Sequence, residues 1–222
     1  MILGISTSLS QFTIAINRDG KLGYHKQSDR KLTGHTGIYE LVVEALEALQ
    51  MTTTDIKGIV VDTGPGGTSS VRTGVSFANG LSYSLDVPVV GISSAELMGI
   101  EAYKKYQTPV ISLFKSIKGN YYCGFYNGEK LEFKFTNLDN ISAYINEEFT
   151  DIVLAGHADG ITKLANLLTI NKTISNIHKV NAITLGENAP ALLTNSNKYP
   201  ILPIPLTETD IPRTDDFSRR TT

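Results

Sequence analysis

A short apolar strand that leads into a glycine-proline turn and a long helix constrains this chain most. The segment Gly-Ile-Val-Val-Asp at 58–62 is rich in β-branched residues, and Gly64-Pro65-Gly66-Gly67 follows it almost at once. Apolar residues then recur at helical spacing over 69–85. A strand that is apolar on both faces is typical of a buried parallel strand. The unit therefore predicts an α/β fold, in which helices cover the sheet.

The residues around this unit complete a first lobe, predicted over 1–106. Residues 2–6, 12–16 and 22–28 have the pattern of an antiparallel meander, with a hairpin loop at 17–20. The remaining elements expected in this lobe are a helix over 37–50, a strand over 87–92 and a helix over 94–106. The sheet is therefore expected to be mixed, with its antiparallel strands at one edge.

The second half of the chain resembles a partial copy of the first, predicted as a second lobe over 107–200. Its expected elements are strands over 109–114, 120–126, 131–135 and 151–156, and helices over 140–149 and 161–168. Asn127-Gly128 predicts a tight type I′ hairpin turn, and Pro190 is expected to break a helix over 182–193. Residues 201–222 are expected to form an extended or partly disordered tail.

Composition excludes several classes of function. The net charge is −2, and no run of Lys or Arg exceeds two residues, so a domain that grips nucleic acid by itself is not expected. Cys123 is the only cysteine, which excludes an internal disulfide and suits a reducing cytoplasm. Its strand-like surroundings predict a packed thiol rather than a nucleophile. No signal peptide or membrane span is expected, which favours a cytosolic protein.

Candidate chemistry is sparse. None of the four histidines lies three or four residues from another, so a helical metal-binding pair is not expected, and there is no Gly-x-Ser-x-Gly nucleophile motif. Gly64, Gly66 and Gly67 stand between a strand and a helix, where backbone amides favour anions. They could line a phosphate cradle, or they could serve only a tight turn that needs glycine. No Lys-Ser or Lys-Thr follows, so this is not a P-loop.

The glycine-proline turn and its surroundings resemble the signature of the TsaB family. The resemblance rests on the Gly-Pro-Gly of residues 64–66, on Val71, Arg72 and Gly74, and on the segments 78–81 and 87–94. The opening residues 2–8 are also similar, and the resemblance covers about residues 1–127. Ser6 departs from the family pattern, because the family has an aspartate there that in actin-like folds helps to hold a nucleotide-bound metal. Lys115-Ser116-Ile117 and Asn120 depart from it as well.

The resemblance implies an actin-like or sugar-kinase-like ATPase fold with a ribonuclease-H-like motif, in two lobes that each have a mixed sheet flanked by helices. It also implies a non-catalytic scaffold subunit for the complex that makes threonylcarbamoyladenosine next to the tRNA anticodon. The partners implied are a TsaD-like catalytic subunit, a TsaE-like ATPase, a second copy when the protein is isolated, and tRNA only through the complex. No catalytic residue, metal or cofactor is expected, although the resemblance leaves room for a nucleotide at a subunit junction.

The resemblance implies that the helices over 37–50 and 69–85 form the interface; the alternative is that each helix only buries one apolar stripe on the sheet. The first carries apolar residues on more than one stripe, and Gly74, Ala78 and Ser82 place small residues four apart on the second. The predicted contact residues are His35, Tyr39, Val42, Val43, Leu46, Arg72, Gly74, Val75, Ala78 and Leu81. Arginine at Val42 or Ala78 is expected to block association without disturbing the fold. Two alternatives stay open: an actin-like ATPase or small-molecule kinase, and a divergent homodimeric paralogue.

Overall fold

The structure is a computed structural model that describes residues 1–9, 11–29, 37–194 and 200–204. These residues form two compact units. The first comprises Met1–Leu97 and Val180–Pro203, and the second is built on Met98–Lys179. The predicted division into 1–106 and 107–200 differs from this one, because the last helix of the second half returns to pack on the first sheet. No described helix is long and apolar enough to cross a membrane.

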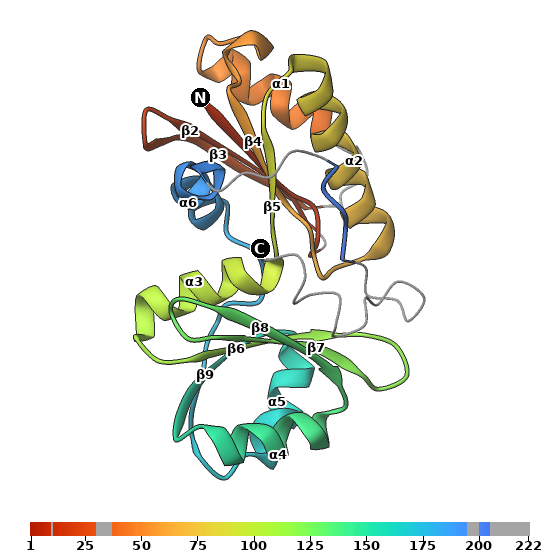
Figure 1. The fold of residues 1–222 in the computed structure, drawn as a ribbon, viewed down its shortest axis with the longest axis vertical. Helices are drawn as coiled ribbons and strands as arrows, with labels where there is room; N and C mark the ends of the chain where they lie inside the picture. The colour runs from red at the N-terminus through yellow and green to blue at the C-terminus, as the bar shows by residue number, and fades with distance from the viewer. Residues whose placement is uncertain (10, 30–36, 195–199, 205–222) are drawn as a thin grey trace. The chain divides into compact units, whose positions relative to one another are not determined.

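The sheet of the first unit has the strand order β3-β2-β1-β4-β5 (Figure 1). Its strands are β1 Ile2–Ser6, β2 Gln11–Arg18, β3 Lys21–Asp29, β4 Gly58–Asp62 and β5 Val89–Ile92. The predicted meander is confirmed, since β1, β2 and β3 pair antiparallel, and β4 pairs parallel to both β1 and β5. Asp19 and Gly20 both have positive φ in the β2–β3 turn, as a primed hairpin turn requires.

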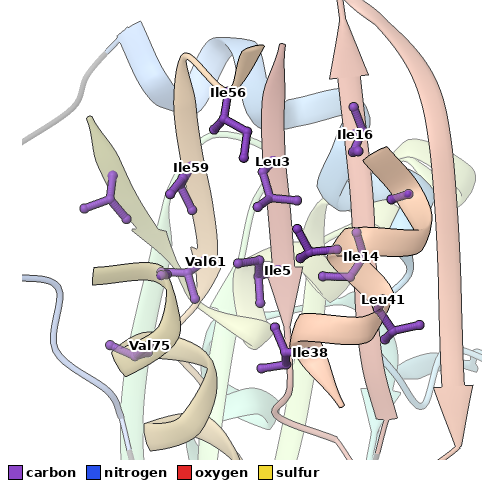
Figure 2. Packing of buried hydrophobic residues seen from close by; sticks show 14 of the residues in the cluster. Leu3, Ile5, Ile14, Ile16, Ile38, Leu41, Ile56, Ile59, Val61 and Val75 are labelled. Atoms are coloured by element: carbon purple, nitrogen blue, oxygen red, sulfur yellow. The ribbon is translucent and has the colours of Figure 1, made fainter. Parts of the chain in front are cut away.

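Helices cover both faces of this sheet. They are α1 Ile38–Ala48, α2 Thr68–Leu85 and α6 Ala182–Thr194. Figure 2 shows the face covered by α1 and α2, where Leu3 and Ile5 of β1 lie among Ile59, Ile14 and the helix residues of one core. Side chains alternate along a strand, so Gly4 faces the other way, and a Cβ there would lie 3.0 Å from Leu185 of α6.

Helix α6 passes through Pro190 without a break, so the predicted interruption is wrong. Proline has no N–H, and its ring crowds the carbonyl four residues earlier, which here belongs to Gly186. The buried side chain of Asn17 on β2 donates an Nδ2–H to that carbonyl at 3.0 Å. The sheet therefore supplies the hydrogen bond that the helix cannot make for itself.

The second unit repeats the element order of the first, with the sheet order β10-β9-β6-β7-β8. Its strands are β6 Val110–Lys115, β7 Tyr121–Tyr126, β8 Leu131–Thr136, β9 Asp151–Gly156 and β10 Asn171–Ile174. The helices of this half are α4 Leu138–Glu148 and α5 Ala158–Leu167, and α3 Ser94–Tyr106 lies across the boundary between the units. The sequence reading missed β10, because all four of its residues are exposed at the sheet edge and show no apolar alternation.

The β7–β8 connection has the predicted length but is not the predicted type I′ turn. Tyr126 pairs with Leu131, so four residues form the loop, and Asn127 is not among the residues with positive φ, as a type I′ turn would need. The Asn127 side-chain oxygen instead accepts the N–H groups of Glu129 and Lys130. The expectation for Cys123 is confirmed: it is fully buried in β7, and burial raises the pKa of its thiol, which favours the unreactive protonated form.

Candidate functional site

The carboxyl ends of β1 and β4 meet the beginning of α3 around one buried carboxylate, Asp62. In open α/β sheets, ligands bind beyond the carboxyl ends of the strands. Asp62 is the last residue of β4, Ser6 is the last of β1, and Ser94 is the first of α3. All three side chains are buried.

Four donors of the first unit converge on the two oxygens of Asp62. Ser6 Oγ and Ser8 Oγ donate to Oδ2 at 2.6 and 2.5 Å. Ser94 Oγ donates to Oδ1 at 2.7 Å, and the Gly64 N–H donates to the same oxygen at 2.9 Å. We call these four donors the strand-end cradle.

Burial and hydrogen bonding act on Asp62 in opposite directions. Loss of solvent raises the pKa of the Asp62 carboxyl above its ordinary value, and this is the largest influence. The hydroxyls of Ser6, Ser8 and Ser94 and the Gly64 N–H lower that pKa, because each donates to the charged form. Ser94 Oγ also lies 2.8 Å from Ser8 Oγ, so its single hydrogen is shared between Ser8 Oγ and Asp62 Oδ1.

The predicted cofactor residues Gly64, Gly66 and Gly67 do lie at this place, but their backbone serves internal contacts. The Gly64 N–H binds Asp62, the Gly64 carbonyl accepts the Ser94 N–H at 2.6 Å, and the Gly67 N–H donates to the Ser8 carbonyl at 3.2 Å. A Cβ on Gly66 would lie 2.4 Å from the Ser8 carbonyl oxygen, so only glycine fits. The glycines therefore pack the turn against the end of β1.

A magnesium-bound nucleotide, which an actin-like fold suggests, does not fit this arrangement. Ser6 stands where the resemblance implies a metal-binding carboxylate, and Asp62 on the next strand uses both oxygens on protein donors. No cluster of three or more His, Cys, Asp or Glu side chains that could hold a metal ion occurs among the described residues. The sequence analysis did not select Asp62, Ser8 or Ser94 as site residues. A usable signal was present, because adjacent parallel strands that end in polar residues indicate a site at the strand ends.

The predicted interface residues on α1 and α2 divide into two groups. The first group is buried and consists of Val42, Leu46, Gly74, Val75 and Ala78. Those that reach the surface in whole or part are Tyr39, Val43, Arg72 and Leu81. His35 lies outside the described residues. The row Gly74, Ala78 and Ser82 faces the sheet, since a Cβ on Gly74 would lie 2.4 Å from Thr7 Oγ1.

A different row of small residues faces outward on α2, and the sequence reading missed it. Its members, spaced three or four apart, are Ser69, Thr73, Ser76, Gly80 and Ser84, all exposed. A Cβ on Gly80 would meet no atom within 4 Å. On α1, which covers the same face of the sheet, Tyr39 is 66% exposed and Val43 is half-buried. We call these seven residues the outer helix face.

The model of the family described as TsaD: tRNA N6-adenosine threonylcarbamoyltransferase matches residues 35–194. A protein of that name from Geotalea uraniireducens is 26% identical over 131 residues, 51% of this chain and 38% of the relative. TsaB proteins from Buchnera aphidicola of Schizaphis graminum and from Bacillus subtilis are 28% and 30% identical over 60% and 56% of this chain. The matches span 67% and 54% of those two relatives.

Solved structures show the same fold at low sequence identity. YeaZ from Pseudomonas aeruginosa superposes with a TM-score of 0.76 at 17% identity, over 91% of this chain and 98% of that one. A candidate N-acetylmannosamine kinase from Listeria monocytogenes superposes with a TM-score of 0.50 at 12% identity, over 87% of this chain. The fold is therefore the actin-like, sugar-kinase-like α/β fold. The chain belongs to the TsaD family, and within it the chain is a TsaB- or YeaZ-like protein.

Proposed function

We propose that this chain is a non-catalytic subunit for tRNA threonylcarbamoyladenosine biosynthesis, which docks a TsaD-like catalytic subunit through the outer helix face. Curated relatives named for that pathway support the assignment. The observation that carries the docking role is the exposed small-residue row of α2, together with the exposed Tyr39 on α1, which packs on the same core. Small residues let a partner helix approach closely, and an exposed aromatic ring is a common anchor of protein interfaces.

The strand-end cradle supports the non-catalytic part of the proposal. Its only acid, Asp62, is buried and bound on both oxygens, so it can neither hold a metal nor accept a substrate proton without rearrangement. The catalytic groups would then belong to the TsaD-like partner. A TsaE-like ATPase, a second copy of this chain in the absence of that partner, and tRNA brought by the complex complete the proposed set. The proposed location is the cytoplasm.

Docking is tested best at Gly80, because this residue is exposed in the middle of α2 and has open space around it. Gly80→Arg should leave the chain folded and abolish co-elution with the TsaD-like subunit of the same organism in size-exclusion chromatography. Asn166→Arg, at an exposed position of α5, adds the same side chain to another helix and is the matched control. Co-elution of Gly80→Arg at the wild-type ratio would show that α2 is not the docking helix.

Val42 and Ala78 are unsuitable for this test, contrary to the sequence-based expectation. Val42 is 4% exposed and Ala78 is fully buried in the core between the helices and the sheet. Arginine there would bury a charge with no partner, so loss of binding would report unfolding. Tyr39→Glu is the second informative variant, since it changes an exposed side chain on α1 and should weaken docking without lowering the unfolding midpoint.

A further inference from the structure

The strand-end cradle has the composition of an oxyanion site. Three hydroxyl groups and one backbone amide point at the same two oxygens, at donor–acceptor distances between 2.5 and 2.9 Å. No Lys, Arg or His is among these donors. Neutral donors of this kind suit a small anion with two acceptor oxygens, because each donor hydrogen bonds to the charged form.

The cradle is built from segments far apart in the chain. Ser6 and Ser8 flank the end of β1, Gly64 follows β4, and Ser94 opens α3 after β5. Supporting contacts hold these segments: Thr7 Oγ1 donates to the Ser70 carbonyl of α2 at 2.6 Å, and Thr63 Oγ1 donates to the Ile92 carbonyl of β5 at 3.1 Å. These contacts hold in place the backbone segments that carry the donors.

We propose that Asp62 is a built-in ligand: its carboxylate fills an oxyanion cradle at the strand ends and keeps phosphate-bearing ligands out of it. The four donors that could hold a phosphate oxygen all contact Asp62, and Ser94 Oγ also contacts Ser8 Oγ at 2.8 Å. The side chain of this residue comes from the sheet itself, so its carboxylate is present at an effectively fixed local concentration. Any nucleotide that the assembly uses must therefore bind elsewhere. This inference does not depend on the docking role of the outer helix face.

The test removes the carboxylate and returns it as a free anion. Asp62→Ala deletes the carboxylate and retains Cβ, and formate has the size of the missing group. We expect the thermal midpoint of Asp62→Ala to fall in chloride and to rise with formate at constant ionic strength. At about 100 times the dissociation constant, ligand binding should raise the midpoint by roughly 5–10 °C. The wild-type chain should not distinguish formate from chloride.

Two controls separate anion binding from a general salt effect. Formamide has the shape of formate without its charge and should not rescue Asp62→Ala. Asp62→Asn fills the cradle with a neutral side chain of equal size and should not respond to formate. If Asp62→Ala does not fold in chloride, the refolded fraction after dilution from urea into formate or into chloride becomes the readout.

Two kinds of result would overturn the proposal that Asp62 is a built-in ligand. The first is that formate stabilises Asp62→Ala no more than it stabilises the wild-type chain, or does not help Asp62→Ala to refold. Calorimetric titration of the wild-type chain with Mg-ATP should give no binding heat. A saturable isotherm that Ser94→Ala weakens would show that the cradle binds phosphate after all. Co-elution with the TsaD-like subunit is a separate readout, so failure of the docking proposal leaves this result unaffected.

Discussion

The hydrogen bond from Asn17 to Gly186 should carry a measurable part of the stability of the first unit. Asn17 is 1% exposed, and its side-chain amide is the described donor to a carbonyl that Pro190 leaves without a helical partner. Asn17→Ala leaves the buried Gly186 carbonyl without this hydrogen bond. The unsatisfied group should cost about 1–3 kcal/mol, in addition to the packing lost with the side chain.

A double-mutant cycle isolates the hydrogen-bond contribution. Pro190→Ala restores an N–H that can donate to the Gly186 carbonyl, so Asn17→Ala should be less harmful in that background. The packing loss is the same in both backgrounds and cancels in the cycle. The coupling energy is therefore expected to be about 1–2 kcal/mol, with the two changes together less destabilising than the sum of the single changes.

The measurement is the free energy of unfolding of the four proteins in urea, followed by circular dichroism and by tyrosine fluorescence. The chain has no tryptophan and ten tyrosines, so the tyrosine signal is usable. Additivity within about 0.3–0.5 kcal/mol would refute the reasoning, because it would mean that the Gly186 carbonyl gains nothing from either donor. Agreement between the two probes checks that a single transition is being measured.

Three further predictions follow from single contacts. Gly80→Ala should raise the thermal midpoint by about 2–4 °C, because alanine is the better helix former and its Cβ has open space there. Gly74→Ala should lower the midpoint, because its Cβ would collide with the buried Thr7. Midpoint shifts of the same sign would contradict this reasoning. The pKa of Asp62 is raised in the folded chain, so the wild-type chain should lose stability relative to Asp62→Asn as the pH rises from about 3.8 through the folded pKa. Urea titrations of both chains measure this difference in unfolding free energy, and a difference that does not change with pH would be inconsistent with the raised pKa. Asn79 exchanges two hydrogen bonds with the Ile201 backbone, so Asn79→Ala should abolish hydrogen-exchange protection of the Ile201 amide, and unchanged protection would argue against this contact.

Most of the elements could be predicted because their apolar residues follow the spacing of one structure. The strand over 58–62, the helix over 69–85 and the opening meander all lie within two residues of their observed bounds. Each carries its own local signal: β-branched runs for strands, three- and four-residue spacing for helices, and Asp19-Gly20 for the first hairpin. These signals are local, so a single sequence contains them.

The differences occur where a distant residue changes what the local pattern means. Pro190 predicts a break, but a β2 side chain satisfies the carbonyl concerned. Asn127-Gly128 predicts a type I′ turn, but Asn127 lacks positive φ and its side chain accepts the N–H groups of Glu129 and Lys130. The polar, exposed strand β10 has no pattern of its own, and it exists because β9 offers a free parallel edge.

For the candidate site, the sequence by itself determined the family signature and the glycine turn, and it predicted α1 and α2 as the docking helices. Only the tertiary structure decided which residues on those helices face outward: Val42 and Ala78 are core, while Gly80 and Tyr39 are surface. It also decided the role of the turn, by bringing Ser6, Ser8 and Ser94 onto Asp62. The physical reason is the same in both cases: helical spacing and residue type define a face or a turn, but what covers that face or fills that turn comes from residues distant in the chain.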